Sequence, residues 1–257
     1  MLTNQLFEYK IALCLYERRD NMSLKAVFFD LDGTLLPMDQ EVFIKTYFKS
    51  IAMRMVPFGY NPDELISAIW KGTGAMIKND GSQTNEQAFW QAFASVLGEE
   101  SLKDTPHFDK FYEEEFDDIR SVCGFNPKAA ETVHALKSKG LRLVLATNPI
   151  FPSIATEKRT RWAGLDVSDF ELYTSYENIS FSKPNLKYYQ TILSKTGLNP
   201  EECLMVGNDV GDDMVAESLG LKVFLLTDCL INKDDTDISV YPHGSFDDLN
   251  DYIGTLI

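Results

Sequence analysis

A run of four apolar residues, Ala26 to Phe29, constrains the fold of this chain more than any other feature. Because polar and apolar side chains do not alternate here, the run predicts a strand that is buried on both faces of a parallel sheet. The sequence DLDGT follows directly at 30–34. Ligands of open α/β sheets bind at the carboxyl ends of the strands, so Asp30 and Asp32 lie where a binding site would form.

The DLDGT segment carries groups suited to metal binding and to nucleophilic attack. The carboxylates of Asp30 and Asp32 can hold a hard cation, and one of them can also attack an electrophile. Gly33 allows a sharp turn or a close approach to a ligand, and Thr34 offers a hydroxyl and a backbone N–H. The simpler interpretation is a strand followed by an acidic turn, because Asp-Gly is a common turn dipeptide.

Three more polar sites follow or lie between apolar runs later in the chain. Thr147 and Asn148 come directly after the apolar run 141–146. An acidic segment, GNDVGDD, begins at Gly207 at the end of another apolar run, and Lys183 lies between these two sites, ahead of a helical pattern. The chain therefore presents two aspartates, a threonine, a lysine and an acidic cluster, in that order.

This order of motifs resembles the haloacid dehalogenase-like (HAD) hydrolase superfamily, whose members are mostly magnesium-dependent phosphatases. The resemblance implies an α/β fold with a Rossmann-like, doubly wound parallel sheet, formed by 22–36 and 122–257. The alternation of strand and helix patterns after residue 124 independently predicts such a sheet. Four amphipathic helical patterns within 37–121 predict a small helical bundle, and the resemblance implies that this insertion is an all-helical cap domain. Residues 1–21 are an N-terminal extension to which we assign no role.

The resemblance also implies a role for each motif. Asp30 would attack phosphorus and carry an aspartyl phosphate, while Asp32 would protonate the leaving oxygen and then deprotonate the attacking water. Thr147 would hydrogen-bond the phosphoryl oxygens, and Lys183 would neutralise the nucleophile and the phosphoryl group. Further contacts to the substrate are expected from Gly33, Thr34 and Asn148.

The acidic cluster departs from the family pattern, which has Gly-Asp and a further acid four or five positions later. Alignment on Gly207 puts Asn208 at the metal-binding position, whereas alignment on the acids puts Asp209 there, with Asp213 four residues later. Because Mg²⁺ prefers carboxylate oxygens, we expect Asp209 to be the direct ligand and Asp213 to act behind it or to orient Lys183. Asn208 is the alternative ligand. The resemblance adds the carboxylate of Asp30 and the backbone carbonyl of Asp32.

Within the predicted cap, the sequence suggests few contacts to the substrate. The segment KGTG at 71–74 predicts a loop that ends a helix, with a mobile loop facing the phosphate as the alternative. Arg54, Lys71 and Lys78 are candidates for contacting an anionic substrate. The aromatic residues of the cap are interpreted as its core.

Charge and composition exclude several classes of partner. The net charge is −15, and no basic face of the kind that binds nucleic acid is visible. No apolar stretch reaches the ~18 residues that a membrane-spanning helix needs. The four cysteines are scattered and form no Cys-x-x-Cys pair, which indicates reduced thiols in a cytoplasmic protein. The three histidines lie far apart, so we expect no zinc site.

The expected function is Mg²⁺-dependent hydrolysis of a small phosphorylated metabolite. A sugar-phosphate mutase shares the motifs, and a phosphonate hydrolase would need a lysine of the cap that forms a Schiff base. A dehalogenase needs no metal, which the acidic cluster argues against. Outside enzymes, a signalling receiver would lack Asp32 and the inserted helices, and intact Asp30 and Asp32 argue against a silent binding protein. The sequence does not name the substrate or the oligomeric state.

Overall fold

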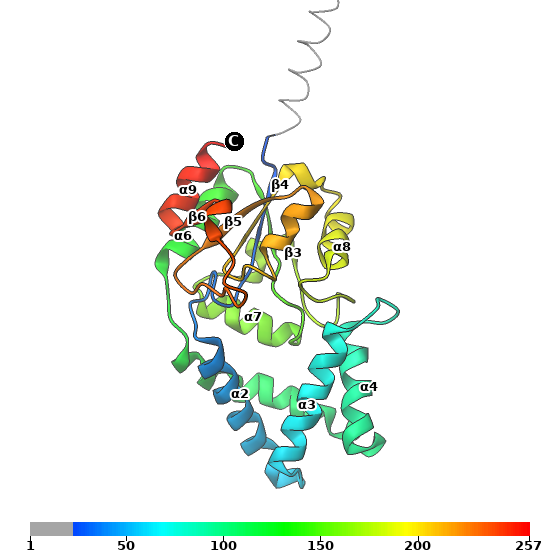
Figure 1. The fold of residues 1–257 in the computed structure, drawn as a ribbon. Helices are drawn as coiled ribbons and strands as arrows, with labels where there is room; N and C mark the ends of the chain where they lie inside the picture. Colours follow the sequence, from blue (N-terminus) through cyan, green and yellow to red (C-terminus); the bar gives the residue numbers. More distant parts are fainter. Residues whose placement is uncertain (1–22) are drawn as a thin grey trace, which may run out of the picture.

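The structure, a computed structural model, describes residues 23–257. A single parallel sheet lies at the centre of this part of the chain (Figure 1). The N-terminal extension predicted at 1–21 lies outside the described residues. The strand order is β3-β2-β1-β4-β5-β6. The strands are β1 (Ala26–Phe29), β2 (Arg142–Leu145), β3 (Leu172–Tyr173), β4 (Cys203–Gly207), β5 (Lys222–Leu226) and β6 (His243–Gly244).

The strand order reverses direction between β1 and β4, because the chain first builds outward through β2 and β3 and then returns to the other side of β1. Ligands of doubly wound sheets bind at such a switch point, outside the carboxyl ends of the strands. All four residues of β1 are buried, with Val27 and Phe29 in one apolar cluster and Ala26 and Phe28 in the other. The predicted doubly wound parallel sheet is confirmed.

Helices cover both faces of the sheet. One face packs against α6 (Pro127–Ser138), α7 (Ser153–Trp162) and α9 (Phe246–Gly254). The other face packs against α8 (Leu186–Thr196) and the 3₁₀ helix Met214–Leu219. Short 3₁₀ helices also occur at Val167–Asp169, Pro200–Glu202 and Ile238–Val240.

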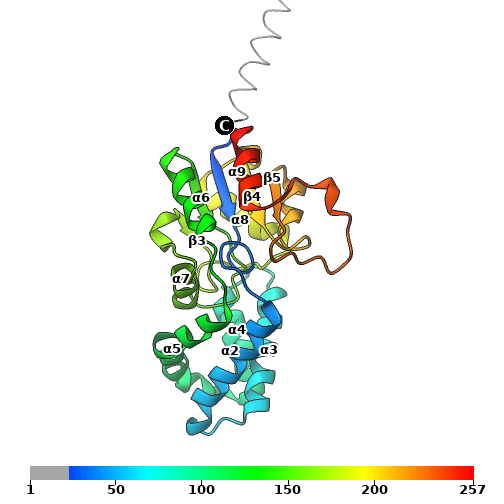
Figure 2. The ribbon, with the colours of Figure 1, turned by 90° about the vertical axis from the view of Figure 1, so that its left-hand side faces the viewer.

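The insertion between β1 and β2 is helical, as expected. It contains α2 (Gln40–Met55), α3 (Pro62–Ile77), α4 (Asn85–Leu97), α5 (Thr105–Glu114) and the 3₁₀ helices Val56–Phe58, Glu99–Asp104 and Phe116–Val122. Figures 1 and 2 show α2 to α5 grouped at the end of the molecule opposite the C-terminus. The N-termini of α2, α3 and α4 are capped by Asp39, Asn61 and Thr84, whose side-chain oxygens accept backbone N–H groups. Most aromatic residues of these helices pack in a buried core, as expected, whereas Trp70 is 51% exposed and Phe58 is 42% exposed.

The helical insertion touches the sheet domain through Asn85, the first residue of α4, which is fully buried. Its side-chain N–H₂ group donates to the carbonyl of Pro149 at 3.0 Å and to the hydroxyl of Ser182 at 3.1 Å. Its backbone N–H donates to the carbonyl of Ile179 at 3.0 Å. These contacts join the insertion to the loops that carry Thr147 and Lys183.

Several local predictions were wrong. Neither β6 nor α9 was expected, because the first has only two residues and the second only nine. The last of the four helical patterns within 37–121 ends as an α-helix at Glu114 and continues as a 3₁₀ helix. The helix after Lys183, α8, begins at Leu186 after a cap by Asn185.

The KGTG segment also differs from its prediction, because 71–74 lies inside α3. A side chain at Gly72 would place its Cβ 2.5 Å from the ring of Phe89 on α4. This glycine therefore permits close packing of α3 against α4 rather than ending a helix.

Two further findings concern the whole described region. No helix within 23–257 has the length and apolarity to cross a membrane. Cys123, Cys203 and Cys229 are free thiols, and Cys203 is buried in β4.

Candidate active site

A cavity of about 150 Å³ lies at the carboxyl ends of the central strands, between the sheet and α2. Eight of the ten site residues predicted from the sequence line it: Asp30, Asp32, Thr147, Asn148, Lys183, Asn208, Asp209 and Asp213. Folding thus brings together residues that are up to 183 positions apart in the sequence, at the switch point of the sheet.

Lys183 lies at the centre of the charged network. Its side chain is 1% exposed, and its Nζ donates to Oδ1 of Asp30 at 2.9 Å and to Oδ1 of Asp213 at 2.6 Å. Burial acts to lower the pKa of Lys183, but the charges of Asp213 and Asp30 outweigh it, so the pKa is raised well above the ordinary value. Lys183 is therefore held as a cation against the carboxylate of Asp30.

Asp32 is paired with an arginine that the sequence analysis did not single out. Arg159, in α7, is fully buried, and its guanidinium donates to Oδ2 of Asp32, while Oδ1 of Asp32 is buried without a hydrogen-bond partner among the described residues. Arg159 also donates to the carbonyl of Ala155 and lies over the ring of Phe151. Burial raises the pKa of Asp32, Arg159 opposes this, and the charge of Asp30 adds to the rise.

Thr34 links the two aspartate-bearing loops. Its hydroxyl oxygen lies 3.1 Å from Oδ2 of Asp30 and 2.9 Å from Oδ1 of Asn208. Its backbone N–H donates to the carbonyl of Leu31, and the N–H of Gly33 donates to the carbonyl of Leu36. Neither Gly33 nor Thr34 lines the cavity. Their hydrogen bonds shape the loop, and their contact with the substrate stays a prediction.

Gly33 has a backbone φ of +86°, a conformation that L-residues adopt at a cost of about 1–2 kcal/mol. An added Cβ would also overlap the side-chain amide of Asn208, lying 2.9 Å from its Cγ. We expect Gly33→Ala to lower kcat by about 10²-fold. The added Cβ would displace the side chain of Asn208, and a displacement of about 1 Å is enough to misalign the active site. Steady-state kinetics with a generic phosphomonoester would measure this loss.

Gly59 provides the matched control for this variant. Its φ is +90°, yet nothing lies within 4 Å of an added Cβ. Gly59→Ala is expected to lose a similar free energy of unfolding, about 1–2 kcal/mol, with kcat unchanged. Equal losses of kcat in both variants would contradict a local role for Gly33.

Asn208, Asp209 and Asp213, which follow β4, make different contacts. Oδ1 of Asp209 accepts the backbone N–H groups of Gly211 at 2.8 Å and Asp212 at 3.0 Å, so this oxygen stabilises its own turn. Asp213 is buried, pairs with Lys183, and accepts the backbone N–H of Asp209 at 3.0 Å. Asn208 instead places its side-chain oxygen next to the hydroxyl of Thr34, which also contacts Asp30.

Thr147 and Asn148 project from the end of β2. The backbone carbonyl of Thr147 accepts hydrogen bonds from the hydroxyls of Thr174 at 2.5 Å and Tyr188 at 2.9 Å, which fix its position. Oδ1 of Asn148 is buried without a partner among residues 23–257, while its N–H₂ group lies 3.4 Å from Asp212. Burial raises the pKa of Asp212.

The three basic candidates of the insertion do not line this cavity. Arg54 forms ion pairs with Glu114 at 3.2 Å and Glu115 at 2.7 Å, and Lys71 and Lys78 are exposed on α3 and at its end. Contact of these three residues with the substrate stays a prediction, which their positions outside the cavity do not favour.

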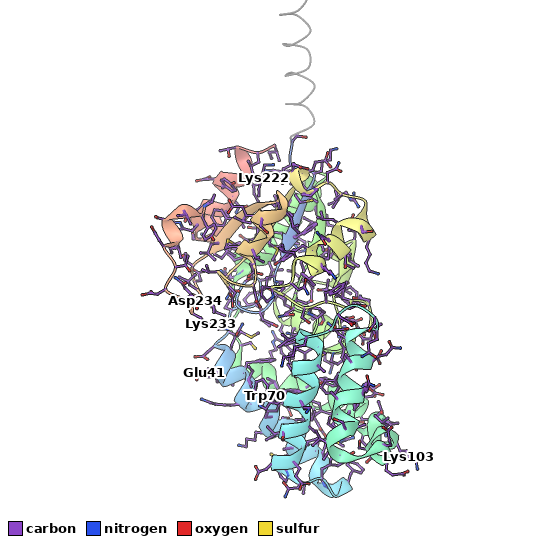
Figure 3. All side chains as sticks on the ribbon, turned by 45° about the vertical axis from the view of Figure 1, so that its right-hand side comes forward. Glu41, Trp70, Lys103, Lys222, Lys233 and Asp234 are labelled. Atoms are coloured by element: carbon purple, nitrogen blue, oxygen red, sulfur yellow. The ribbon has the colours of Figure 1, made fainter. Side chains whose placement is uncertain are left out.

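A lysine of the long β5–β6 connection lines the cavity instead. Lys233 shares the cavity wall with Gln40 of α2. Figure 3 shows Lys233 and Asp234 on the side of the sheet domain and Glu41 of α2 below them. Arg159, Asp212 and Lys233 are thus site residues that sequence reasoning missed. Only Asp212, within the acidic cluster, carried a signal.

The donor set fits a divalent cation. A hydroxyl has one proton to donate, so Thr34 leaves one of the two oxygens that converge on it, from Asp30 and Asn208, without a donor. Five carboxyl groups line the cavity, and three cationic side chains, those of Lys183, Lys233 and Arg159, accompany them, so acidic groups outnumber basic groups at the site. The carboxylates are Asp30, Asp32, Asp209, Asp212 and Asp213.

The cation would have to be held by mixed ligands. No group of three His, Cys, Asp or Glu side chains within 23–257 has the geometry of a metal site. Mg²⁺ in proteins commonly takes one or two carboxylates and keeps several waters. An amide oxygen and a backbone carbonyl beside the carboxylate of Asp30 are compatible with this habit.

Comparison with known proteins gives a consistent result. The family model for haloacid dehalogenase-like hydrolases matches residues 24–220. A glyceraldehyde 3-phosphate phosphatase of Methanothermobacter thermautotrophicus is 30% identical over 207 residues, which cover 79% of this chain and 85% of the relative.

Solved structures share the fold. One described as a predicted phosphoglycolate phosphatase from Haemophilus somnus superposes with a TM-score of 0.56 at 20% identity, covering 89% of this chain and 97% of the other. The HAD-hydrolase YfnB from Bacillus subtilis, bound to magnesium, superposes with a TM-score of 0.52 at 16% identity, covering 90% and 99%.

Proposed function

Because the chain belongs to the haloacid dehalogenase-like hydrolase family and its relatives there are phosphatases, we propose that it hydrolyses small phosphomonoesters with Mg²⁺ through an aspartyl phosphate on Asp30. The observation that carries the proposal is the contact of Lys183 with Asp30 inside a cavity that also holds Asp32 and Thr147. Phosphate monoesters are kinetically inert, so such a site must supply positioning and charge neutralisation.

Asp30 is the nucleophile of this proposal. Lys183 and the hydroxyl of Thr34 each hold one of its oxygens, which orients the carboxylate toward the cavity. One carboxylate oxygen forms a bond to phosphorus while the bond from phosphorus to the alcohol oxygen breaks. Lys183 is then positioned to offset the negative charge that gathers between the carboxylate and the phosphoryl oxygens.

Asp32 is the proton carrier. Its burial favours the protonated form, which can donate a proton to the departing alcohol oxygen. The resulting carboxylate then accepts a proton from the water that attacks the phosphorus of the intermediate. Arg159 fixes one oxygen of Asp32, and the other oxygen has no partner among the described residues and is free for this transfer.

The remaining groups bind and enclose the phosphoryl group. Thr147 and Asn148, held at the end of β2, are proposed to hydrogen-bond its oxygens. We propose that 22–36 and 122–257 form the catalytic core and that 37–121 form the cap, which excludes water and selects the substrate. The anchoring of Asn85 to the loops of the core supports this arrangement.

A Mg²⁺ ion would be held by the carboxylate of Asp30, the backbone carbonyl of Asp32 and the side-chain oxygen of Asn208. We now favour Asn208 over Asp209, because one oxygen of Asp209 is used by its own turn. Asp213 keeps the role of orienting Lys183. The bound ion would neutralise and orient the phosphoryl oxygens.

Removal of divalent cations tests the proposal directly. We expect excess EDTA to lower turnover of an aryl phosphate by at least about 10²-fold and added Mg²⁺ to restore it, since the ion would be worth several kcal/mol in the transition state. Release of inorganic phosphate is the measurement, with EDTA pre-saturated with Mg²⁺ as the control. Undiminished turnover in EDTA after extensive dialysis would contradict the metal dependence.

A further inference from the structure

A second cavity, of about 100 Å³, lies between helices α2 to α5 of the insertion and residues 150–152 and Tyr176 of the sheet domain. Its walls are almost entirely aromatic or aliphatic, and none of its lining residues within 23–257 is charged. Trp70 stands at its rim, 51% exposed, and is visible on the surface of the insertion in Figure 3. The aromatic core of the insertion is therefore not completely filled.

This aromatic cavity adjoins the candidate active site. Ile44 of α2 and Ile150 and Phe151 of the loop after β2 line both cavities. Phe151 follows Thr147 by four residues, so the partition between the cavities stands next to the group proposed to bind phosphate. When a phosphoryl group lies at Asp30, these three side chains are therefore the groups that separate the alcohol part of the ester from the aromatic cavity.

Three of the polar side chains of the aromatic cavity are already engaged, and the others are the indole N–H groups of Trp70 and Trp90 and the hydroxyl of Tyr176. The hydroxyls of Tyr47 and Tyr112 contact each other at 2.8 Å, and the hydroxyl of Thr73 donates to the carbonyl of Ile69 at 2.9 Å. A carboxylate that entered the cavity would lose its hydration without a cation to pair with, and a polyhydroxylated group would find few hydrogen-bond partners, and both losses cost free energy. An apolar group would gain from the same burial.

We propose that the substrates are phosphomonoesters of small apolar alcohols, whose alkyl group occupies the aromatic cavity. This inference rests on the proposed phosphatase function and specifies its substrate class. Since a cavity of about 150 Å³ accommodates benzene, one of 100 Å³ accommodates about four carbons. We expect carboxylate-bearing esters such as phosphoglycolate to be poor substrates.

The test is a comparison of kcat/KM for methyl, ethyl, propyl and butyl phosphate with that for phosphoglycolate, all with Mg²⁺. The alcohols leave with similar intrinsic ease, so differences report on binding of the chain. We expect kcat/KM to rise about fourfold with each methylene, or about 60-fold from methyl to butyl, because each buried methylene contributes a constant increment. Phosphoglycolate is expected to fall below butyl phosphate by a similar factor.

A cavity-filling variant locates the effect. Thr73→Phe places a ring in the aromatic cavity and should reduce the ratio of butyl to methyl kcat/KM at least about tenfold. Thr191→Phe is the matched control, because Thr191 of α8 makes the same hydrogen bond to the carbonyl four residues earlier but lies outside both cavities. The control should keep the ratio of the unmodified protein.

The outcomes separate the two proposals. A flat alkyl series, a preference for phosphoglycolate, or an unchanged ratio in folded Thr73→Phe would overturn the substrate class while leaving the phosphatase function intact. Absence of phosphate release from every ester, including an aryl phosphate with Mg²⁺, would overturn the phosphatase function itself. If Thr73→Phe does not fold, the alkyl series of the unmodified protein still decides the matter.

Discussion

Replacement of Asp30 with asparagine is expected to reduce kcat at least about 10⁴-fold, because removal of a nucleophile that forms a covalent intermediate eliminates the pathway rather than slowing it. Asparagine has nearly the same shape as aspartate, so it fits beside Lys183 and Thr34 in the place of Asp30. The loss should therefore appear in kcat with the fold intact. Phosphate release and far-ultraviolet circular dichroism, measured on the same preparation, check both parts.

Asp39→Asn is the matched control for the loss of a carboxylate. Asp39 is exposed and caps α2 by accepting two backbone N–H groups, a role that asparagine performs about equally well. Its kcat should equal that of the unmodified protein. Retention of more than about one tenth of the activity by Asp30→Asn would contradict the assignment of Asp30 as the nucleophile.

Replacement of Lys183 with methionine is expected to cost both stability and activity. The lysine is 1% exposed, and its removal leaves Asp30 and Asp213 buried together without their counter-ion. Breaking a buried pair in this way typically lowers the free energy of unfolding by about 3–5 kcal/mol. Urea denaturation in metal-free buffer measures this loss, and phosphate release should be abolished at the same time.

Two companion variants identify the source of that loss. Lys195→Met changes an exposed lysine of α8 and should alter the free energy of unfolding by less than about 0.5 kcal/mol. Adding Asp213→Asn to Lys183→Met removes one of the two stranded carboxylates and should recover part of the stability, but not the activity. Equal stability of Lys183→Met and the unmodified protein would show that the network is not electrostatically coupled.

The sheet and most of the candidate site follow from local sequence patterns. The unbroken apolar run of β1 predicts a strand buried on both faces, and the polar residues at the ends of β1, β2 and β4 meet because parallel strands bring their carboxyl ends to one edge. Each of these signals acts over a few residues.

What the sequence does not reveal depends on contacts between distant segments. Arg159 lies in a helix with several basic residues, and only the packing of α7 beneath the site brings its guanidinium to Asp32. The choice between Asn208 and Asp209 depends on which side chain the turn itself uses. The sequence around Gly72 resembles a helix end, yet this glycine lies inside α3 and allows Phe89 of α4 to pack closely against it.

The central claim is that phosphorus is transferred to Asp30, and trapping the intermediate tests it most directly. Asp32→Asn should still react with an aryl phosphate, whose leaving group needs no proton, but should activate water poorly, so the phosphorylated form accumulates. Borohydride reduces an aspartyl phosphate to homoserine, which peptide mass spectrometry locates. The account predicts homoserine at position 30 after incubation with substrate and Mg²⁺. A burst of released phenol with Asp30 unmodified would contradict it.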